Sequence, residues 1–231
     1  MDYQMDYHVI IAKYKEDISW LEEMDKSHIY LYDKGYTENN PITGFAHYEQ
    51  RPNVGRESET YLYHIIKNYD NLPEYLIFIQ GDPFPHFQTE EKIQPKYFQQ
   101  QIERLIYDKL METTPLFSRY RIELNYCMPG LNVTEYYSYI FQGSIELSTF
   151  SPGCQYYLHK SKILSKPKAF WEKIHKMLVN GIYYNGGEFT MKNSDEEDIP
   201  FYKNGMNPWT FERLAGYLFN DTPINPSFLE D

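Results

Sequence analysis

The stretch Tyr75-Leu76-Ile77-Phe78-Ile79-Gln80-Gly81-Asp82 decides the fold, because an uninterrupted apolar run enters a polar loop here. A run this short, with Pro73 before it and Gly81-Asp82 after it, is typical of a strand and not of a helix. The apolar residues are continuous instead of alternating. Both faces of the strand are therefore expected to be covered, as in a parallel sheet with helices on each side.

Upstream of this strand, the chain repeats the same alternation of elements. Tyr7–Ala12 and His28–Tyr32 are short β-branched or aromatic runs that predict strands, whereas Ile18–Glu22 and Glu57–Tyr69 have helical spacing. The order strand, helix, strand, loop, helix, strand predicts parallel strands joined by right-handed crossovers. The expected class is therefore α/β, with a mainly parallel central sheet flanked by helices.

The remainder of the chain gives weaker signals. The further elements expected are helices at 95–111, 170–179 and 208–219 and a strand at 153–159. Segments 122–124 and 136–141 fit either a strand or a loop, and 184–202, with its acidic run, reads as an exposed loop. Neither an internal repeat nor a linker interrupts the sequence, so one domain spanning residues 1–231 is expected.

Composition restricts the classes of function. The 231 residues contain 22 Lys and Arg against 33 Asp and Glu, a formal net charge of −11. Such a charge disfavours binding to nucleic acid or to anionic membranes. The polar, acidic first residues are unlike a signal peptide, and no apolar run is long enough for a transmembrane helix. With only two cysteines, the expected location is the cytoplasm, that of a host cell if the source is a virus.

Polar residues follow three of the predicted strands, at 13–17, 33–35 and 80–86. Because ligands bind beyond the carboxyl ends of the strands in an open parallel sheet, these segments are expected to converge on one crevice. The motifs of dinucleotide-binding folds, P-loops, serine hydrolases and zinc proteases are absent from the sequence.

The segment Gln80 to His86 is the sharpest candidate for a metal site. A carboxylate at Asp82 and an imidazole at His86 could share one divalent cation, with His159 as a third ligand. The alternatives are that Asp82 caps its own loop, and that His86 and His159 are ordinary surface residues.

Other candidates also have two interpretations. The turn Asn53-Val54-Gly55-Arg56 opens a helix and could hold a phosphate or carboxylate, or could be ordinary turn chemistry. Asp17 is either the N-cap of the next helix or a ligand contact. Glu212 either pairs with Arg213 or places a general base in the crevice.

Several motifs resemble known families. The segments 10–17, Asn53-Val54-Gly55 and Phe78-Ile79-Gln80-Gly81-Asp82 are similar to the donor-site motifs of family-2-type glycosyltransferases, which have the glycosyltransferase-A fold. More closely, the chain from about Val9 to Phe219 resembles an uncharacterised glycosyltransferase-like family. The motifs that carry this second resemblance are 53–57, 80–84, 151–155, 163–167 and 211–214.

The resemblance implies a single-domain, Rossmann-like glycosyltransferase-A fold and a nucleotide-sugar donor linked to UDP, GDP or dTDP. The donor-binding residues that it implies are Ala12, Tyr14, Asp17, Asp33, Asn53, Arg56, Gln80 and Gly81. A divalent cation, Mn or Mg, would bind at Asp82, His86 and His159, and Glu212 would be the catalytic base. The sequence departs from the family-2 Asp-x-Asp motif in one respect, since Gln80 replaces its first carboxylate.

The leading hypothesis from the sequence is therefore a glycosyltransferase that transfers a sugar to a glycan or to another hydroxyl acceptor. The first alternative is a non-catalytic carbohydrate- or partner-binding module with the same fold, which the change to Gln80 favours. A second alternative is a metal-dependent phosphohydrolase that uses Asp82 and His86.

Overall fold

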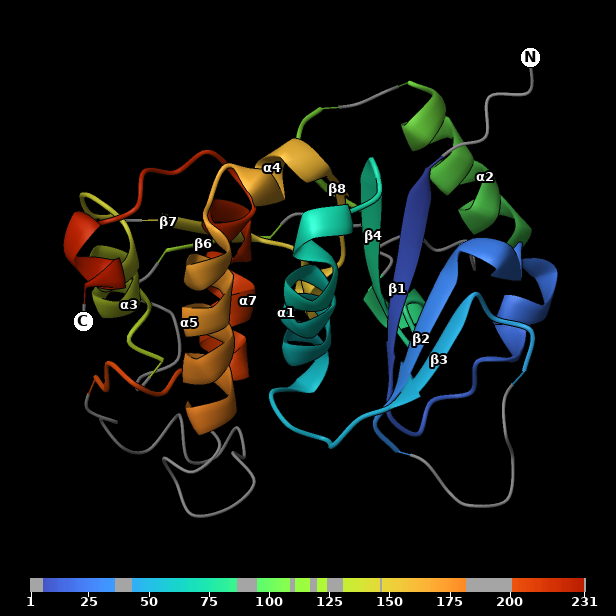
Figure 1. The fold of residues 1–231 in the computed structure, drawn as a ribbon, viewed down its shortest axis with the longest axis horizontal. Helices are drawn as coiled ribbons and strands as arrows, with labels where there is room; N and C mark the ends of the chain where they lie inside the picture. The colour runs from blue at the N-terminus through green and yellow to red at the C-terminus, as the bar shows by residue number, and fades with distance from the viewer. Residues whose placement is uncertain are drawn as a thin grey trace.

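The computed structural model describes residues 6–35, 43–86, 95–108, 111–116, 120–123, 131–145, 147–181 and 201–230. Its centre is a six-stranded sheet in the order β3-β2-β1-β4-β8-β5 (Figure 1). The strands of this sheet are β1 (Tyr7–Lys13), β2 (Ile29–Asp33), β3 (His47–Gln50), β4 (Tyr75–Gln80), β5 (Thr114–Pro115) and β8 (Tyr156–His159). A separate antiparallel pair consists of β6 (Tyr120–Glu123) and β7 (Leu147–Phe150).

The direction of the strands follows the predicted order of elements. β1 pairs in parallel with β2 on one side and with β4 on the other, and β2 pairs in parallel with β3. The added strand β8 runs antiparallel to both β4 and β5. The prediction of an α/β fold with a mainly parallel sheet is therefore confirmed.

Helices cover both faces of the sheet. The helices are α1 (Arg56–Asn68), α2 (Pro95–Tyr107), α3 (Val133–Ile140), α4 (Lys160–Leu164), α5 (Lys168–Asn180) and α7 (Pro208–Leu218). α2 lies on one face, whereas α1, α5 and α7 lie on the other (Figure 1). Within the described ranges, none of the helices has the length and apolar character needed to span a bilayer.

β4 shows why the apolar run is continuous. Leu76 and Phe78 pack into the core beneath α1, and the ring of Phe78 stacks on Tyr61 of α1 at 4.7 Å between centroids. Ile77 and Ile79 point to the opposite face and pack with residues of α2. Each such buried side chain contributes about 1.5–3 kcal/mol to folding, so the strand is stabilised from both sides.

Four local predictions need comment. Residues 136–141, predicted as a strand or loop, belong mostly to helix α3, and β3 forms within a stretch that was expected to be a polar loop. The predicted helix at 18–22 is a short 3₁₀ turn, Ser19–Glu23, whose N-cap is Ile18 and not Asp17. Most of the predicted loop 184–202 lies outside the described residues. The single-domain organisation stays a prediction.

Candidate functional site

The carboxyl ends of β1 and β4 lie side by side. Ala12 is in register with Gln80, and the backbone N–H of Gly81 donates to the carbonyl of Ala12 at 2.9 Å. The chain leaves β1 toward β2 on one side and later returns to β4 on the other, which makes this a topological switch point. Open α/β sheets bind ligands in the crevice outside the strand ends at such a point.

A pocket of about 400 Å³ opens at this position. Its lining residues are Ala12, Tyr14, Glu16, Lys34, Asn53, Gly55, Arg56, Glu57, Gln80, Gly181, Asn207, Pro208 and Trp209. They come from the ends of β1, β2 and β4, from the starts of α1 and α7 and, for Gly181, from the end of α5. The volume lies within the range of small-molecule sites in proteins.

Two helices begin at the wall of the pocket. α1 starts at Arg56, whose guanidinium lies 4.5 Å from the ring centroid of Trp209. α7 starts at Pro208, and the side chain of Asn207 accepts a hydrogen bond from the N–H of Trp209 at 2.9 Å. Helix N-termini carry partial positive charge. Together with Arg56, they favour a ligand with an anionic group, while Trp209 offers a ring face for stacking.

Gln80 is supported from below by the turn at 151–155. A Cβ on Gly153 would lie 2.5 Å from the amide of Gln80, so a side chain at Gly153 would displace Gln80. The side-chain oxygen of the buried Gln155 accepts a hydrogen bond from the backbone N–H of Gln80 at 3.2 Å. Gly153 in turn donates its N–H to Oε1 of Glu212 at 2.6 Å. Glu212 is therefore linked to the floor of the pocket through Gly153.

The carboxyl group of Glu212 has an unusual protonation equilibrium. Burial and the nearby charge of Glu57 raise the pKa of Glu212 to about 7, against the opposing effects of Arg213 and the Gly153 N–H. Arg213 Nη1 donates to Glu212 Oε2 at 3.2 Å. The predicted ion pair with Arg213 is thus present, and the group also titrates near neutrality, as general acid–base catalysis requires. Glu212 is not among the pocket-lining residues.

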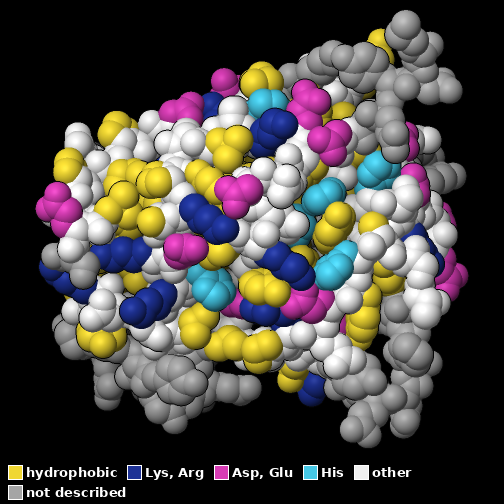
Figure 2. Space-filling model, viewed as in Figure 1, with side chains coloured by type: hydrophobic (Ala, Val, Ile, Leu, Met, Phe, Trp, Pro, Cys, Tyr) yellow, Lys and Arg dark blue, Asp and Glu magenta, His cyan; other side chains and the backbone are white. Residues whose placement is uncertain are grey.

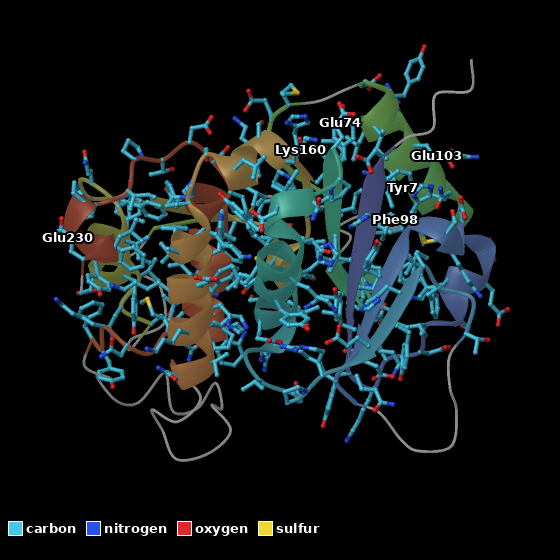
Figure 3. All side chains as sticks on the ribbon, in the orientation of Figure 1. Tyr7, Glu74, Phe98, Glu103, Lys160 and Glu230 are labelled. Carbon is cyan, nitrogen blue, oxygen red and sulfur yellow. The ribbon has the colours of Figure 1, made fainter. Side chains whose placement is uncertain are left out.

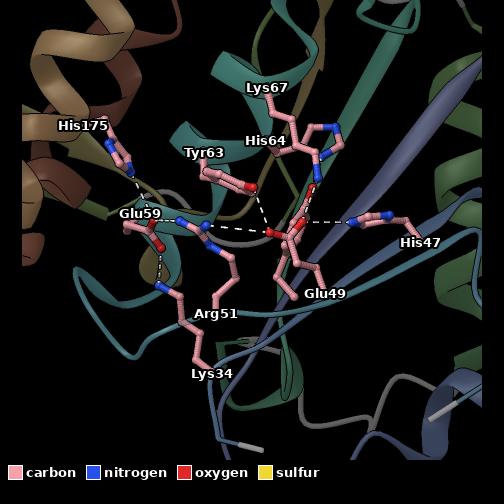
Figure 4. A network of polar contacts seen from close by, with 10 residues as sticks. Lys34, His47, Glu49, Arg51, Glu59, Tyr63, His64, Lys67 and His175 are labelled. Carbon is pink, nitrogen blue, oxygen red and sulfur yellow. Dashed lines mark hydrogen bonds and ion pairs between the residues drawn. The ribbon is translucent and has the colours of Figure 1, made fainter. Parts of the chain in front are cut away.

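A buried polar network supports the wall on the side of β2 and α1 (Figure 4). Glu59 of α1 accepts from Arg51 at 2.6 Å, pairs with Lys34 at 2.7 Å and lies 3.0 Å from Nε2 of His175. Burial alone would raise the pKa of Glu59, but these partners together hold it at about 2. Burial also lowers the pKa of Lys34, against the attraction of Glu59.

The residues predicted to bind metal do not form one site. Oδ1 of Asp82 accepts from the N–H of Phe84 at 3.3 Å, as the loop-capping interpretation requires. His159 pairs with Tyr75, the first residue of β4, whereas Asp82 follows the last residue, Gln80. Tyr75 and Gln80 are about 16 Å apart along the strand at the usual rise per residue. This placement contradicts a cation shared by His159 and Asp82. The side chain of His86 lies outside the described part of the structure.

The contacts of His159 and its neighbour place them at the amino-terminal end of β4, away from the pocket. Lys160, the next residue, donates its N–H to the carbonyl of Glu74, and both lie at the same end of the sheet (Figure 3). His159 caps α4 by accepting from the N–H of Ser161 at 3.2 Å. Within the described residues, no three His, Cys, Asp or Glu side chains form a group that could hold a metal ion.

Five of the predicted donor-site residues line the pocket, namely Ala12, Tyr14, Asn53, Arg56 and Gln80. Three others lie apart from its lining. Asp33 is buried against Lys13, with Oδ2 3.0 Å from Nζ, and Asp17 accepts from the N–H of Ser19 at 2.9 Å. Gly81 is fixed by its hydrogen bond to β1 and by the indole of Trp20, which donates to its carbonyl at 2.8 Å. These three have structural partners that the sequence did not reveal.

Glu16, Lys34 and Gly55 also line the pocket; they lie in the segments 13–17 and 33–35 expected at the crevice and in the turn 53–56, but none was assigned a role of its own. Sequence reasoning missed the lining residues Glu57, Gly181, Asn207, Pro208 and Trp209. Asn207-Pro208 is a helix-start signal of the kind applied to residues 53–56, so the start of α7 could have been considered as a wall. No local pattern marks Gly181, at the end of α5, as part of a pocket wall.

The fold and the pocket define a class, an α/β protein with a ligand-sized pocket at the switch point of a mainly parallel sheet. The chain belongs to the family described as "Protein of unknown function (DUF3431)", whose model matches residues 9–185. That span runs from within β1 to beyond α5 and includes the pocket residues up to Gly181, while the start of α7 lies beyond it. Searches of curated proteins and of solved structures find no match.

Proposed function

We propose that the protein is a nucleotide-sugar-dependent glycosyltransferase with a glycosyltransferase-A fold. The observation that carries the proposal is the pocket between the ends of β1 and β4, lined by five of the residues that the resemblance to glycosyltransferases implies. The parallel order β3-β2-β1-β4 also supports it, because a Rossmann-like half-sheet of this kind binds nucleotides at its switch point.

The side chains suggest a division of roles within the pocket. Arg56 and the first turn of α1 would bind the donor diphosphate, and Tyr14 or Trp209 would stack on the base or the sugar. Glu212, with its pKa of about 7, is the proposed acceptor for the proton of the attacking hydroxyl. Because Glu212 lies behind Gly153 and outside the pocket lining, this role requires its hydrogen bond from Gly153 to break. A proton acceptor near neutral pKa is half ionised at physiological pH and can be regenerated in each cycle.

A divalent cation on the diphosphate stays part of the proposal, with Asp82 as its candidate ligand. The described side chains do not supply a complete ligand set, so the roles proposed for Arg56 and Glu212 do not depend on the cation. Its contribution is therefore measured directly by testing donors in the presence and absence of manganese.

A thermal-shift screen of UDP-, GDP- and dTDP-sugars tests the proposal. At a donor concentration of 100 times Kd, binding stabilises the native state by about 2.7 kcal/mol, so a clear rise in Tm is expected for at least one donor. Folded protein that no donor stabilises, with or without manganese, would count against the proposal. Donor hydrolysis by the wild type and by Glu212→Gln then tests for turnover.

The alternative is a non-catalytic binding module with the same fold. The specific observation in its favour is Gln80, an uncharged side chain at the pocket floor where the Asp-x-Asp motif of family-2-type glycosyltransferases has a carboxylate. Donor or glycan binding without hydrolysis or transfer would support this alternative.

A further inference from the structure

The pocket wall contains a turn with strained backbone geometry. Gly55 has φ +60° and Arg56 has φ +52°, so two successive residues adopt the left-handed conformation. For a residue with a side chain, such as Arg56, this region costs about 1–3 kcal/mol. The turn places the guanidinium of Arg56 over Trp209 at the pocket. Contacts elsewhere must therefore stabilise it.

Lys34 makes the contacts that hold this turn. Its ammonium group donates to the carbonyl of Val54 at 2.7 Å and to the carbonyl of Arg56 at 2.5 Å. These two carbonyls lie on either side of Gly55. Lys34 therefore fixes the backbone both before and after the first left-handed residue.

The third partner of Lys34 is Glu59, whose Oε2 lies 2.7 Å from Nζ. This contact is an ion pair, because Oε2 of Glu59 has no hydrogen-bond partner among the described residues. Lys34 lines the pocket, and both of its hydrogen bonds go to backbone carbonyls of the wall. Its contacts are therefore those of a group that shapes the pocket.

Glu59 is fixed in turn by side chains from other elements. Arg51, which follows β3, and His175 of α5 both contact Oε1, while Oε2 is left to Lys34 (Figure 4). The exposed edge of this network lies beside α1, where blue, magenta and cyan side chains gather in the space-filling view (Figure 2). The network thus connects β3, α1 and α5 to a single buried ammonium group.

We propose that Lys34 is a positioning residue, which holds the left-handed turn of Gly55 and Arg56 in the conformation that forms the pocket wall. The turn geometry can be tested without any ligand. The effect on ligand binding rests on the proposed function, with the nucleotide-sugar donor as the occupant.

The test uses Lys34→Met/Glu59→Gln, which removes both charges of the Lys34–Glu59 pair. The amide at position 59 keeps an oxygen that can accept from Arg51, and Arg51 keeps its ion pair with Glu49 at 3.7 Å. The control is Lys67→Met, which breaks a more exposed lysine–glutamate pair between α1 and β3, Lys67 with Glu49 at 2.8 Å. Circular dichroism and thermal unfolding first establish that both variants are folded at the assay temperature.

Tryptophan quenching by acrylamide reports the turn. Trp209 is half-buried beneath Arg56, whereas Trp20 and Trp171 are buried in the core. The quenching constant of the double variant is expected to rise about twofold, with Lys67→Met unchanged. A double variant that quenches like the wild type would overturn the proposal, as would an equal rise in the control.

Calorimetric titration with UDP-glucose and manganese measures the effect on the pocket. About tenfold weaker binding is expected for the double variant and wild-type binding for Lys67→Met. Equal binding by all three proteins would overturn the claim that the turn shapes the donor pocket. If the wild type itself does not bind UDP-glucose, the choice of this donor fails, while the quenching result still decides the role of Lys34.

Discussion

The ammonium of Lys34 lies 2.7 Å from Oε2 of Glu59, and both side chains are almost completely buried. A buried ion pair contributes little net stability when both charges are removed together, but the loss of one partner leaves the other without compensation. Replacing Lys34 alone should therefore lower the free energy of unfolding more than replacing Lys34 and Glu59 together.

Lys34→Met is expected to reduce the free energy of unfolding by about 3–5 kcal/mol, because the carboxylate of Glu59 loses a partner inside the protein. Adding Glu59→Gln to this variant should restore part of the loss. Urea unfolding at pH 7 measures both values. A single variant as stable as the wild type would show that Arg51 and His175 suffice to compensate Glu59.

Glu59 also predicts how acid affects stability. Because its pKa is held at about 2 in the native state, against 4.5 in the unfolded chain, its stabilising effect is complete above pH 4.5. It is lost as pH falls toward 2 and amounts to something on the order of 3 kcal/mol. Glu59→Gln should flatten the fall in stability between pH 4.5 and 2. Urea unfolding across this range tests it, and an unchanged slope would contradict the prediction.

Glu212 is expected to show the opposite pH dependence. Its native pKa of about 7 lies above the unfolded value of 4.5, so the native state binds the proton more tightly. Its contribution to stability is largest below pH 4.5 and is lost as pH rises through 7. Glu212→Gln, which keeps an acceptor for the Gly153 N–H, should therefore be more stable than the wild type at pH 8. Thermal unfolding at pH 4 and pH 8 gives the comparison, and a variant destabilised equally at both would contradict it.

Gly55→Ala and Gly143→Ala together distinguish two costs to the free energy of unfolding, that of a positive φ and that of a steric clash. Both glycines have positive φ, but a Cβ on Gly143 meets nothing within 4 Å, whereas one on Gly55 lies 2.8 Å from Cβ of Glu59 and 3.2 Å from Leu178. The strain alone should cost about 1 kcal/mol at Gly143. Gly55→Ala should cost about 2 kcal/mol more and alter the pocket wall. Equal losses in urea unfolding would show that α1 and α5 adjust without cost.

Trp209→Ala tests the stacking surface of the pocket. Loss of the indole should weaken donor binding about tenfold, in line with about 1.4 kcal/mol for an aromatic contact. Tyr107→Ala is a suitable control, since Tyr107 is 83% exposed on α2 and is not among the pocket-lining residues. Titration with the donor that gives the largest thermal shift provides the measurement. Unchanged affinity in Trp209→Ala would place the ligand elsewhere in the pocket.

Local patterns in the sequence determined the central part of the fold. The continuous apolar run of β4 predicted a strand covered on both faces, and the order of elements predicted parallel pairing with β1. From this pairing alone the carboxyl ends of β1 and β4 could be placed together. Five donor-site residues found at the pocket follow from that geometry and from motif resemblance.

Only the tertiary structure decided which polar residues share a site. Asp17 and Gly81 are held by hydrogen bonds with the backbone, and Asp33 by an ion pair with Lys13. His159 lies at the far end of β4 because β8 runs antiparallel to that strand. Trp209 reaches the pocket from a helix start that the sequence did not connect with the strand ends, and the contacts of Lys34 with Glu59 and the 54–56 turn were not predictable from its position after β2. A local pattern sets the periodicity of burial, whereas partners distant in the chain set the surroundings of each charge. The sequence therefore determined where the strands end, and the packing of α1 and α7 determined what faces the pocket there.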